Sequence, residues 1–341
     1  MFVEDREELE GVPEPGDVIL GKFRVDRVLG VGGMGCVVAA THTTLDQPVA
    51  IKFLLSSAAK NPKNIHRFTR EAQAAAKIKS DHVAKVSDVG TLPTGVPYMV
   101  MEYLDGEDLA DRIARGPIEV TRAASFMLEA CEALAEAHAA GIIHRDLKPA
   151  NLFVARAANG EERIKVLDFG ISKIVAEPGK GADLTKTSTL MGSPLYMSPE
   201  QMTNAKAADH RTDIWALGCI LFECLTAQPP FIGTTLPEIC SKILTRPPTP
   251  MAEVAPHIPP ALTAVVERCL TKEPDERYAS LNDLAHDLAP FAGEMAARSV
   301  AVISGVLGMP NTLGRPAAHG YHASGGSGAF AAPSGSVVAA R

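Results

Sequence analysis

The sequence predicts an α+β protein, with a β-rich N-terminal part and a mainly helical C-terminal part. Three apolar segments of strand length, 23–28, 49–52 and 96–104, lie in the N-terminal part. Later segments instead place apolar residues at helical spacing, in 121–140 and 212–226. This order, strands first and helices afterwards, is typical of the α+β class.

Composition limits the function classes. The 341 residues suggest one large or two modest domains, and 46% apolar residues suffice for a packed core. A net charge of −7 argues against nucleic-acid binding. No apolar run is long enough to span a membrane, and the acidic N-terminus lacks the apolar core of a secretory signal. The cysteines are scattered without a C-x-x-C pair, which argues against zinc and favours a reducing, cytoplasmic location: Cys36, Cys131, Cys219, Cys224, Cys240 and Cys269.

The two ends of the chain differ from its middle. Residues 1–20 are rich in Glu, Pro and Gly, so we expect a flexible leader. Residues 293–341 are rich in Gly, Ala, Ser and Pro, which predicts a low-complexity, disordered tail. The apolar patch 299–309 inside this tail is too short to span a bilayer, and a short docking segment is the alternative there. The chain is then either a complete soluble protein or a shortened form of a longer one.

The polar string from His144 to Asn151 organises the middle of the chain. After Asn151 come two short apolar segments, 152–154 and 164–167, joined by the polar bend 157–163, which predicts a hairpin. The hairpin would bring Asp146 and Asn151 close to Asp168 at one sheet edge. Asp146 could accept a proton from a hydroxyl, and Asn151 and Asp168 offer the oxygen ligands that Mg²⁺ prefers. These groups are the equipment for transferring a phosphoryl group from a nucleotide.

A glycine-rich loop, G-x-G-x-x-G-x-V, runs from Gly30 to Val37. A Rossmann loop would open a helix, but the segment 37–42 continues as a strand. A Walker loop would need Gly-Lys-Ser/Thr, and Cys36-Val37 stands there instead. The remaining interpretation is a hairpin that covers nucleotide phosphates, where glycine lets backbone N–H groups approach closely. An ordinary glycine hairpin is the alternative.

The next strand, 49–52, carries Lys52 among apolar residues, and a buried lysine needs a carboxylate. The predicted helix 64–79 contains one acidic residue, Glu71, on the same broad face as its apolar residues. Glu71 can therefore point inward, and a solvent-exposed helix carboxylate is the alternative.

The string H-R-D-L-K-P-x-N at 144–151, followed by D-F-G at 168–170, resembles the catalytic and metal loops of eukaryotic-type (Hanks-type) bacterial serine/threonine protein kinases. The glycine-rich loop and V-A-I-K at 49–52 resemble further signatures of this family. The resemblance implies the two-lobed protein kinase fold over 21–292. The N-lobe, at about 21–103, would be small, antiparallel and β-rich with one key helix, and the C-lobe, at about 104–292, would be larger and mainly helical.

This resemblance also implies the partners of the protein and a role in signal transduction. The cofactors would be ATP and Mg²⁺, with Mn²⁺ as a substitute, and the substrates would be Ser or Thr hydroxyls of proteins. A transient homodimer could serve autophosphorylation between two copies.

By resemblance, individual residues receive roles. The catalytic residues would be Asp146, Lys148, Lys52 and Glu71, and the metal ligands Asn151 and Asp168. The segment 96–104 is similar to the kinase hinge, with Met101 as the gatekeeper and the backbone of Glu102 and Leu104 against adenine. Plain strand core is the alternative for Met101, and both roles can hold together. The complete nucleotide-binding set would be Leu29, Gly30, Val31, Gly32, Gly33, Gly35, Val37, Ala50, Lys52, Met101, Glu102, Leu104, Asp108 and Phe153.

Residues 171–199 are polar and rich in hydroxyls, and they resemble an activation segment that ends in Ser198-Pro199-Glu200. Thr185 and Thr187 stand where related bacterial kinases autophosphorylate, so they are the expected regulatory sites; an unphosphorylated polar loop is the alternative. Arg145, next to the catalytic Asp146, carries a charge that a phosphorylated loop could meet.

Further residues would support the site. The family resemblance implies that Asp213 bonds the backbone of the catalytic loop and that Arg277 pairs with Glu200. We expect His144 to be structural and Trp215, the only tryptophan, to lie in the core.

Three positions depart from the family pattern. Asp81-His82-Val83 replaces the usual His-Pro-Asn, Ser193 replaces a threonine, and Ser198 replaces the alanine of A-P-E. A pseudokinase that binds nucleotide without turnover is one alternative function, although no catalytic residue is lost. A small-molecule phosphotransferase with the same fold is the other. A reactive Cys36 thiol that slows ATP binding on oxidation is a further hypothesis.

Overall fold

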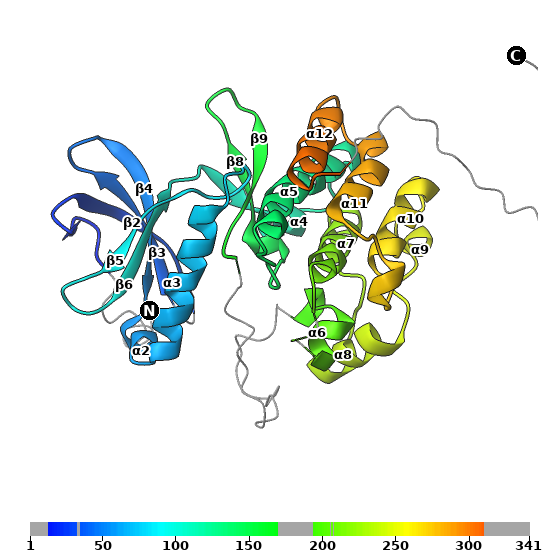
Figure 1. Cartoon of the computed structure of the whole chain (residues 1–341), viewed down its shortest axis with the longest axis horizontal. Helices are drawn as coiled ribbons and strands as arrows, with labels where there is room; N and C mark the ends of the chain where they lie inside the picture. Colours follow the sequence, from blue (N-terminus) through cyan, green and yellow to red (C-terminus); the bar gives the residue numbers. More distant parts are fainter. Residues whose placement is uncertain (1–12, 33–34, 170–193, 205, 207, 310–341) are drawn as a thin grey trace, which may run out of the picture.

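The computed structural model describes residues 13–32, 35–169, 194–204, 206 and 208–309, which form two lobes (Figure 1). The N-lobe contains a six-stranded antiparallel sheet in the order β1-β2-β3-β4-β6-β5. Its strands are β1 (Val18–Ile19), β2 (Phe23–Gly32), β3 (Gly35–His42), β4 (Gln47–Leu54), β5 (Val86–Thr91) and β6 (Pro97–Glu102). Two helices accompany this sheet, α2 (Ser56–Ala59) and α3 (Pro62–Lys77). The predicted β-rich lobe with one long helix is confirmed.

The register of the sheet separates two faces. Lys52 pairs with Val37 on one side and Met99 on the other, so these three side chains share a face. Met99 packs with Leu54 of β4 and with Phe68 of α3 on that face. The residues one position along, such as Ile51, point to the opposite face and form a separate apolar cluster. The face that α3 covers is therefore the face that carries Lys52.

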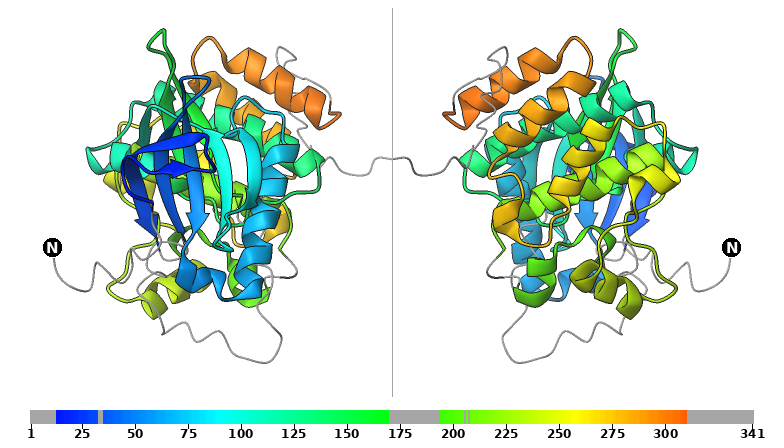
Figure 2. Two further views of the ribbon diagram at one scale, coloured as in Figure 1. Left: turned by 90° about the vertical axis from the view of Figure 1, so that its left-hand side faces the viewer. Right: turned by 90° about the vertical axis from the view of Figure 1, so that its right-hand side faces the viewer.

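The C-lobe contains a small sheet and most of the helices (Figures 1 and 2). The sheet consists of β7 (Gly106–Asp108), β8 (Leu152–Arg156) and β9 (Glu162–Val166). The α-helices are α4 (Leu109–Ala114), α5 (Val120–Ala139), α6 (Pro199–Asn204), α7 (Arg211–Thr226), α8 (Leu236–Thr245), α9 (Met251–Val254), α10 (Pro260–Cys269), α11 (Leu281–Leu288) and α12 (Ala296–Val306). Short 3₁₀ turns are η1 (Pro149–Asn151), η4 (Pro194–Tyr196), η5 (Pro274–Glu276) and η6 (Ala289–Phe291).

Helix starts follow from capping residues. Asn61 accepts a hydrogen bond from the amide of Lys63 at the start of α3, and Pro62 occupies the first turn. Asp108 caps α4 through the amide of Asp111 at 2.9 Å. Helix α7 ends where Ala227 adopts a left-handed conformation, with φ of 56°.

The C-lobe core is built around α5 and α7, the helices in which most residues are buried. Trp215 of α7 is fully buried, as expected, and stacks on Phe231 with an interplanar angle of 6°. A helix that is apolar on nearly all sides needs neighbours all round, which α5, α9 and α10 provide.

Helix α12 corrects the prediction of a disordered tail that begins at residue 293. Val300 and Ile303 are fully buried, and α12 packs against α5 and α11. Ser304 donates a 2.6 Å hydrogen bond to Asn282 in this interface. The apolar patch 299–309 is therefore part of a packed helix, in which residues at positions i and i+3 form one apolar stripe. The small residues between them give the segment an average composition that resembles a disordered tail. Residues 310–341 lie outside the described part of the chain.

The predicted leader is also too long. Val18 and Ile19 pair with Arg24 and Phe23 as strand β1, and Ile19 is buried in the sheet cluster. Regular structure thus begins before residue 21. Among the described residues, none of the helices has the length and apolar character that a membrane crossing requires.

Candidate active site

The predicted hairpin exists as β8 and β9, joined by a tight turn. Leu152 pairs with Val166, and beyond this pair the amide of Leu167 donates a 2.8 Å hydrogen bond to the carbonyl of Asn151. Asn151 and Asp168 are therefore held at the same open end of the hairpin. The side-chain amide of Asn151 donates to the carbonyl of Asp146 at 2.8 Å, which ties the catalytic loop to this end. The structure thus brings Asp146, Asn151 and Asp168 together.

Asp213 holds the catalytic loop from beneath. Its carboxylate accepts hydrogen bonds from the amides of His144, at 3.0 Å, and Arg145, at 2.9 Å, and a third from the ring of His138 at 2.8 Å. Burial favours the neutral acid, but His138 and the other donors outweigh it, so the pKa of Asp213 is lowered. Arg145 has a positive φ of 64°, a conformation that an L-residue adopts only when its surroundings hold it. The Asp213 bonds supply that restraint.

His144 is structural, as expected. It is fully buried, its ring bonds the carbonyl of Leu167 at 3.0 Å, and it packs against the ring of the buried Phe169. This contact places the catalytic loop directly against the residues that carry Asp168. Asp168 has a positive φ of 50°, a second strained backbone position at the same site.

Lys52 connects the two lobes. Its ammonium lies 2.8 Å from Glu71 of α3 and 2.6 Å from Asp168 of the C-lobe. The Lys52 side chain is 18% exposed and that of Glu71 is 16% exposed. The Glu71 side chain therefore points inward and is largely shielded from solvent.

The three charges shift one another's protonation. Burial, and then the negative charge of Asp168, raise the pKa of Glu71 to about 7. Partial burial opposes the charge of Asp168, whose side chain is still 46% exposed, and the adjacent ammonium of Lys52 outweighs this effect and lowers the pKa of Asp168. Burial likewise opposes the charge on Lys52, but both carboxylates raise the pKa of its ammonium above its ordinary value. The result is a charged lysine facing an ionised Asp168.

Lys148 completes the polar group, with its ammonium 3.7 Å from Asp146 Oδ2. Both side chains are partly exposed, Lys148 at 29% and Asp146 at 18%. A hydroxyl and a phosphate can therefore reach both from the cleft.

The predicted adenine residues share the face of the sheet that carries Lys52. Ala50 pairs with Met101 across β4 and β6, and Val37 pairs with Lys52. Met101 is half-buried and packs toward α3, as strand core does, and its role as the gatekeeper stays a prediction. Phe153 of β8 is half-buried and pairs with Asp108 of β7, which places both next to the hinge.

The hinge is fastened by side chains that the sequence did not suggest. Glu102 accepts hydrogen bonds from the amide of Lys85, at 2.9 Å, and from the ammonium of Lys165, at 2.8 Å. The amide of Glu102 donates to the carbonyl of Lys85, which restricts the predicted adenine contacts to the carbonyl of Glu102 and the main chain of Leu104. Asp108, predicted near the ribose, also caps α4.

The glycine-rich hairpin β2–β3 contains two kinds of glycine. A Cβ at Gly35 would come within 2.4 Å of the carbonyl oxygen of Phe53, so packing against β4 requires glycine there. A Cβ at Gly30 would meet nothing within 4 Å, and one at Gly32 would meet only a backbone oxygen at 4.0 Å. The protein itself does not require glycine at these two positions, whereas close approach of phosphates would. Leu29 and Val31 are exposed on the same hairpin.

The structure argues against the reactive Cys36 hypothesis. Cys36 is 1% exposed, pairs with Phe53 and belongs to the apolar cluster on the face opposite Lys52. Burial raises the pKa of its thiol, which disfavours the reactive thiolate. The alternation of side chains along β3 explains this outcome, because the neighbour Val37 takes the cleft-facing position.

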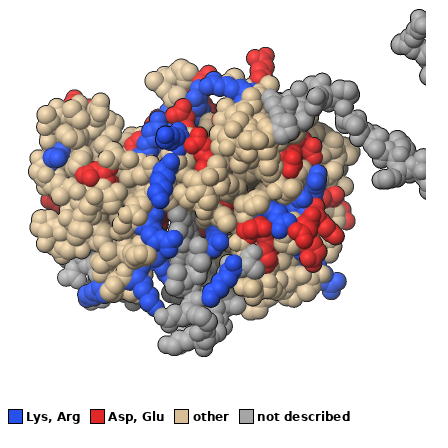
Figure 3. All heavy atoms as spheres, viewed as in Figure 1, with Lys and Arg blue, Asp and Glu red and all other residues tan. Residues whose placement is uncertain are grey.

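Arg145 faces a basic cavity of about 210 Å³, lined also by Arg70 and Lys77 of α3. Two of its guanidinium nitrogens, Nε and Nη1, are buried and have no hydrogen-bond partner within the described residues, while the third bonds the carbonyl of Ala208 at 3.1 Å. Figure 3 shows Lys and Arg gathered along α3 and the junction of the lobes. The cavity can accept an anion.

Sequence reasoning missed two residues that hold this loop. Gln201 of α6 donates to the carbonyl of Arg145 at 3.0 Å, and His138 of α5 bonds Asp213. Neither has a distinctive spacing, because both reach the loop from other elements. Gly33, Gly170, Ser193, Thr185 and Thr187 lie outside the described residues.

The donor set fits a nucleotide with a divalent metal ion. Asn151 and Asp168 offer amide and carboxylate oxygens at one edge, and Lys52 offers a cation beside them. When bound, the metal ion would neutralise phosphate charge between these groups.

Known proteins resemble this chain. Residues 23–289 match the family model described as the protein kinase domain. Serine/threonine-protein kinase PknB of Mycolicibacterium smegmatis is 38% identical over 78% of this chain and 42% of that protein. Serine/threonine-protein kinase pkn3 of Myxococcus xanthus is 37% identical over 78% of this chain and 49% of that protein. The chain thus spans less than half the length of these two relatives.

Solved structures agree. The crystal structure of the Mycobacterium tuberculosis PknI kinase domain aligns with a TM-score of 0.62 at 26% identity, covering 82% of this chain and 100% of that one. The matched region includes both lobes and every catalytic motif described above, and the chain belongs to the protein kinase family.

Proposed function

We propose that the protein is a serine/threonine protein kinase that transfers the γ-phosphoryl group of ATP to Ser or Thr hydroxyls of proteins. One observation carries the proposal: Lys52 contacts both Glu71 and Asp168, so the N-lobe and C-lobe parts of the phosphate site are joined. The names of the bacterial relatives support the same activity.

The chain's own residues divide the work. Asp146 orients the substrate hydroxyl and receives its proton, and the amide of Asn151 holds Asp146 in place through its carbonyl. Lys148, close to Asp146, would bind the transferred phosphate, and a lysine at this position is typical of Ser/Thr specificity. Lys52, oriented by Glu71, bears on the other phosphates. Most of the rate enhancement then comes from positioning and charge stabilisation.

We propose Mg²⁺ as the metal, with Mn²⁺ as a substitute, because the ligands would be hard oxygens of Asn151 and Asp168. Val37, Ala50, Met101 and Phe153 would hold the adenine. A cytoplasmic location fits the cysteines, since all six are free thiols.

Regulation would act through Arg145. A phosphate on Thr185 or Thr187 could enter the basic cavity and pair with the unpartnered nitrogens of Arg145. Two copies would meet transiently for this autophosphorylation.

Autophosphorylation with labelled ATP and Mg²⁺ tests the proposal, with the wild type compared with Asp146→Asn and phosphosites mapped by mass spectrometry. We expect label on Thr185 or Thr187 in the wild type alone. If the protein bound ATP but transferred no label to itself or to protein substrates, it would be a pseudokinase instead. Equal label in the variant would refute the role of Asp146.

A further inference from the structure

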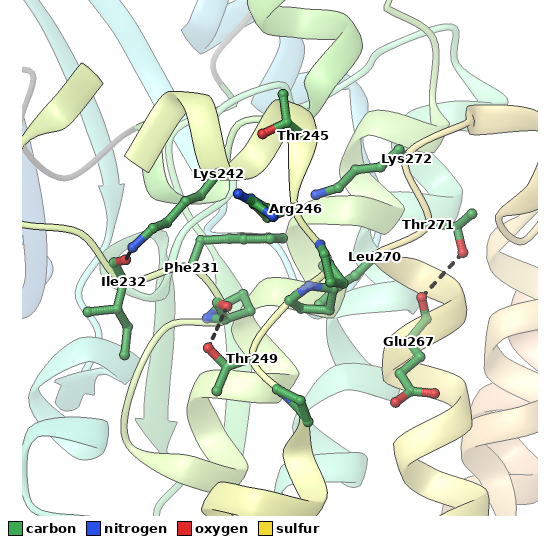
Figure 4. A pocket seen from close by; sticks show the side chains of 14 residues that line it. Phe231, Ile232, Lys242, Thr245, Arg246, Thr249, Glu267, Leu270, Thr271 and Lys272 are labelled. Atoms are coloured by element: carbon green, nitrogen blue, oxygen red, sulfur yellow. Dashed lines mark hydrogen bonds between the residues drawn. The ribbon is translucent and has the colours of Figure 1, made fainter. Parts of the chain in front are cut away.

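A groove on the C-lobe is not used by the catalytic machinery. We call it the α8–α10 groove; it has a volume of about 1070 Å³ and lies between the α7–α8 connection, the segment after α8, and the end of α10 (Figure 4). Phe231, Arg246, Leu270 and Lys272 line it. Its volume is at the upper end of the range for small-molecule pockets, so several residues of an extended peptide fit.

Lys272 is an unusual cation in the wall of this groove. Its ammonium lies 4.1 Å from the ring centre of Phe231 and 4.8 Å from that of Trp215. Its Nζ is buried, and within the described residues it has no hydrogen-bond partner. Burial lowers the pKa of Lys272 to about 8, and no carboxylate among the described residues forms an ion pair with its ammonium.

The remaining charges leave a positive surplus. Lys242 is neutralised by Glu238 at 2.8 Å and also bonds the carbonyl of Ile232. Arg246 is exposed, and the described part of the chain offers its guanidinium neither an ion pair nor a hydrogen bond. The carboxylate of Glu267 lies on the groove's rim and points away from Lys272 in Figure 4. Within the described residues, Arg246 and Lys272 therefore have no carboxylate partner, although the net charge of the chain is −7.

Prolines and large apolar side chains form much of the remaining wall, together with Thr245, Thr249 and Thr271. Pro247, Pro248 and Pro250 have no backbone N–H to offer, and Ile232 is 49% exposed beside the buried Phe231. Such a surface favours a ligand that carries an apolar side chain next to an anionic group. The apolar side chain would contact the prolines, and the anionic group would meet the two cations.

The position of the groove relates it to substrates. Helix α8 packs against η4 and α6, which lie at the C-terminal end of the predicted activation segment 171–199. Lys242 and Thr245 of α8 also line the groove, so a single helix connects the end of this segment to the groove.

We propose that the α8–α10 groove is a docking site for an acidic segment of protein substrates, in which a carboxylate adjoins an apolar residue. The carboxylate would pair with Arg246, with Lys272 beneath it, and the apolar side chain would lie against Leu270 and the prolines. This inference rests on the proposed kinase activity and adds a determinant of substrate choice.

Selection from a library of short random peptides by the immobilised full chain tests the proposal. Arg246→Glu reverses the exposed charge, and Lys272→Met removes the buried one while keeping the aliphatic stem. Arg298→Glu on α12, also exposed, is the matched control. We expect the wild type and Arg298→Glu to enrich peptides with Asp or Glu beside Leu, Ile or Phe. Arg246→Glu should lower affinity for the enriched peptide about tenfold or more, since like charges then meet.

A second measurement separates docking from catalysis. A short acceptor peptide, alone or joined by a flexible linker to the enriched segment, serves as the substrate. The segment should lower KM about tenfold in the wild type but not in Arg246→Glu, with kcat and the KM of the short peptide unchanged.

Several outcomes would overturn the docking proposal. The first two are that the wild type enriches no acidic and apolar peptide, or that Arg246→Glu enriches the same peptides equally well. The third is that free glutamate or inorganic phosphate competes fully with the peptide. The fourth is that the wild type is a dimer and that Arg246→Glu dissociates it. If the wild type did not phosphorylate even the short peptide, the proposed kinase function itself would be refuted.

Discussion

The guanidinium of Arg277 donates two hydrogen bonds of 2.7 Å to the two carboxylate oxygens of Glu200, 77 residues earlier in the chain. The Arg277 side chain is fully buried, and it also bonds the carbonyls of Thr271 and Lys272. The pair fastens α6, which begins at the end of the predicted activation segment, to the connection between α10 and α11. The ion pair expected from the family resemblance therefore has bidentate geometry and full satisfaction of its donors.

Breaking this pair from one side should be costly. Arg277→Leu would leave the Glu200 carboxylate without its partner, so we expect the free energy of unfolding to fall by about 3–5 kcal/mol. Urea denaturation followed by tryptophan fluorescence measures this, because Trp215 is the only tryptophan. The double variant with Glu200→Leu should recover part of the loss. Purely additive losses would contradict the coupling.

The same pair predicts a pH dependence of stability. Burial opposes the charge of Glu200, but Arg277 outweighs it, so the folded-state pKa of Glu200 lies below the ordinary 4.5. The stabilisation is therefore complete above pH 4.5 and is lost as the pH falls through the folded-state pKa. The difference in unfolding free energy between the wild type and Glu200→Gln should shrink below pH 4.5. A constant difference across the acid range would refute it.

Lys52 should matter more for turnover than Glu71. Lys52→Met removes the charge beside the phosphates, and we expect kcat to fall by a factor on the order of 10²–10³. Glu71→Gln keeps a hydrogen-bond acceptor, so its loss should be smaller. Steady-state kinetics on a peptide substrate measures both, and the exposed Lys22→Met is the control. Greater loss in Glu71→Gln would mean that Glu71 acts beyond orienting Lys52.

Asp213 is a positioning residue, and its substitution should separate kcat from KM. Asp213→Asn replaces one acceptor oxygen with an amide that faces the N–H groups of the catalytic loop, leaving a buried donor unsatisfied at a cost of about 1–3 kcal/mol. We expect a large fall in kcat with little change in the KM for ATP, because the adenine site lies on other elements. An equal rise in that KM would indicate general unfolding of the cleft instead.

The residues that the sequence predicted best are those whose chemistry and spacing are both restricted. Asp146, Asn151 and Asp168 belong to motifs separated by one short hairpin, so their proximity followed from strand pairing. The family resemblance pairs Lys52 with Glu71, and the single acidic residue of α3 supports that choice. Hydrogen bonds from other elements could not be predicted this way. Gln201 and Lys165 reach the site from α6 and β9, and only the tertiary fold brings them there.

Two errors have the same physical origin. The hypothesis of a reactive Cys36 follows from its place beside the glycine-rich loop, but strand alternation turns its side chain to the opposite face. The segment after residue 293 was assigned to a tail from its composition, although its spacing decides the structure. In both cases, a correct prediction depends on the direction in which each side chain points, and composition does not contain this information.

Helix α12 should contribute measurably to stability. Val300 and Ile303 are fully buried against the C-lobe, and burying each apolar side chain contributes about 1.5–3 kcal/mol. A chain that ends after residue 309 should unfold at the same urea concentration as the full chain. A chain that ends after residue 293 should be less stable by about 3 kcal/mol or more.

Point variants separate packing from chain length. Ile303→Ala should cost about 2–5 kcal/mol, because it leaves a cavity between α12 and its neighbours. Val302→Ala, at a position 36% exposed in the same helix, is the matched control and should cost far less. Equal losses in the two variants would mean that α12 does not pack as the structure describes. A catalytic rate that stays constant when α12 is removed would show that the helix stabilises the fold without shaping the active site.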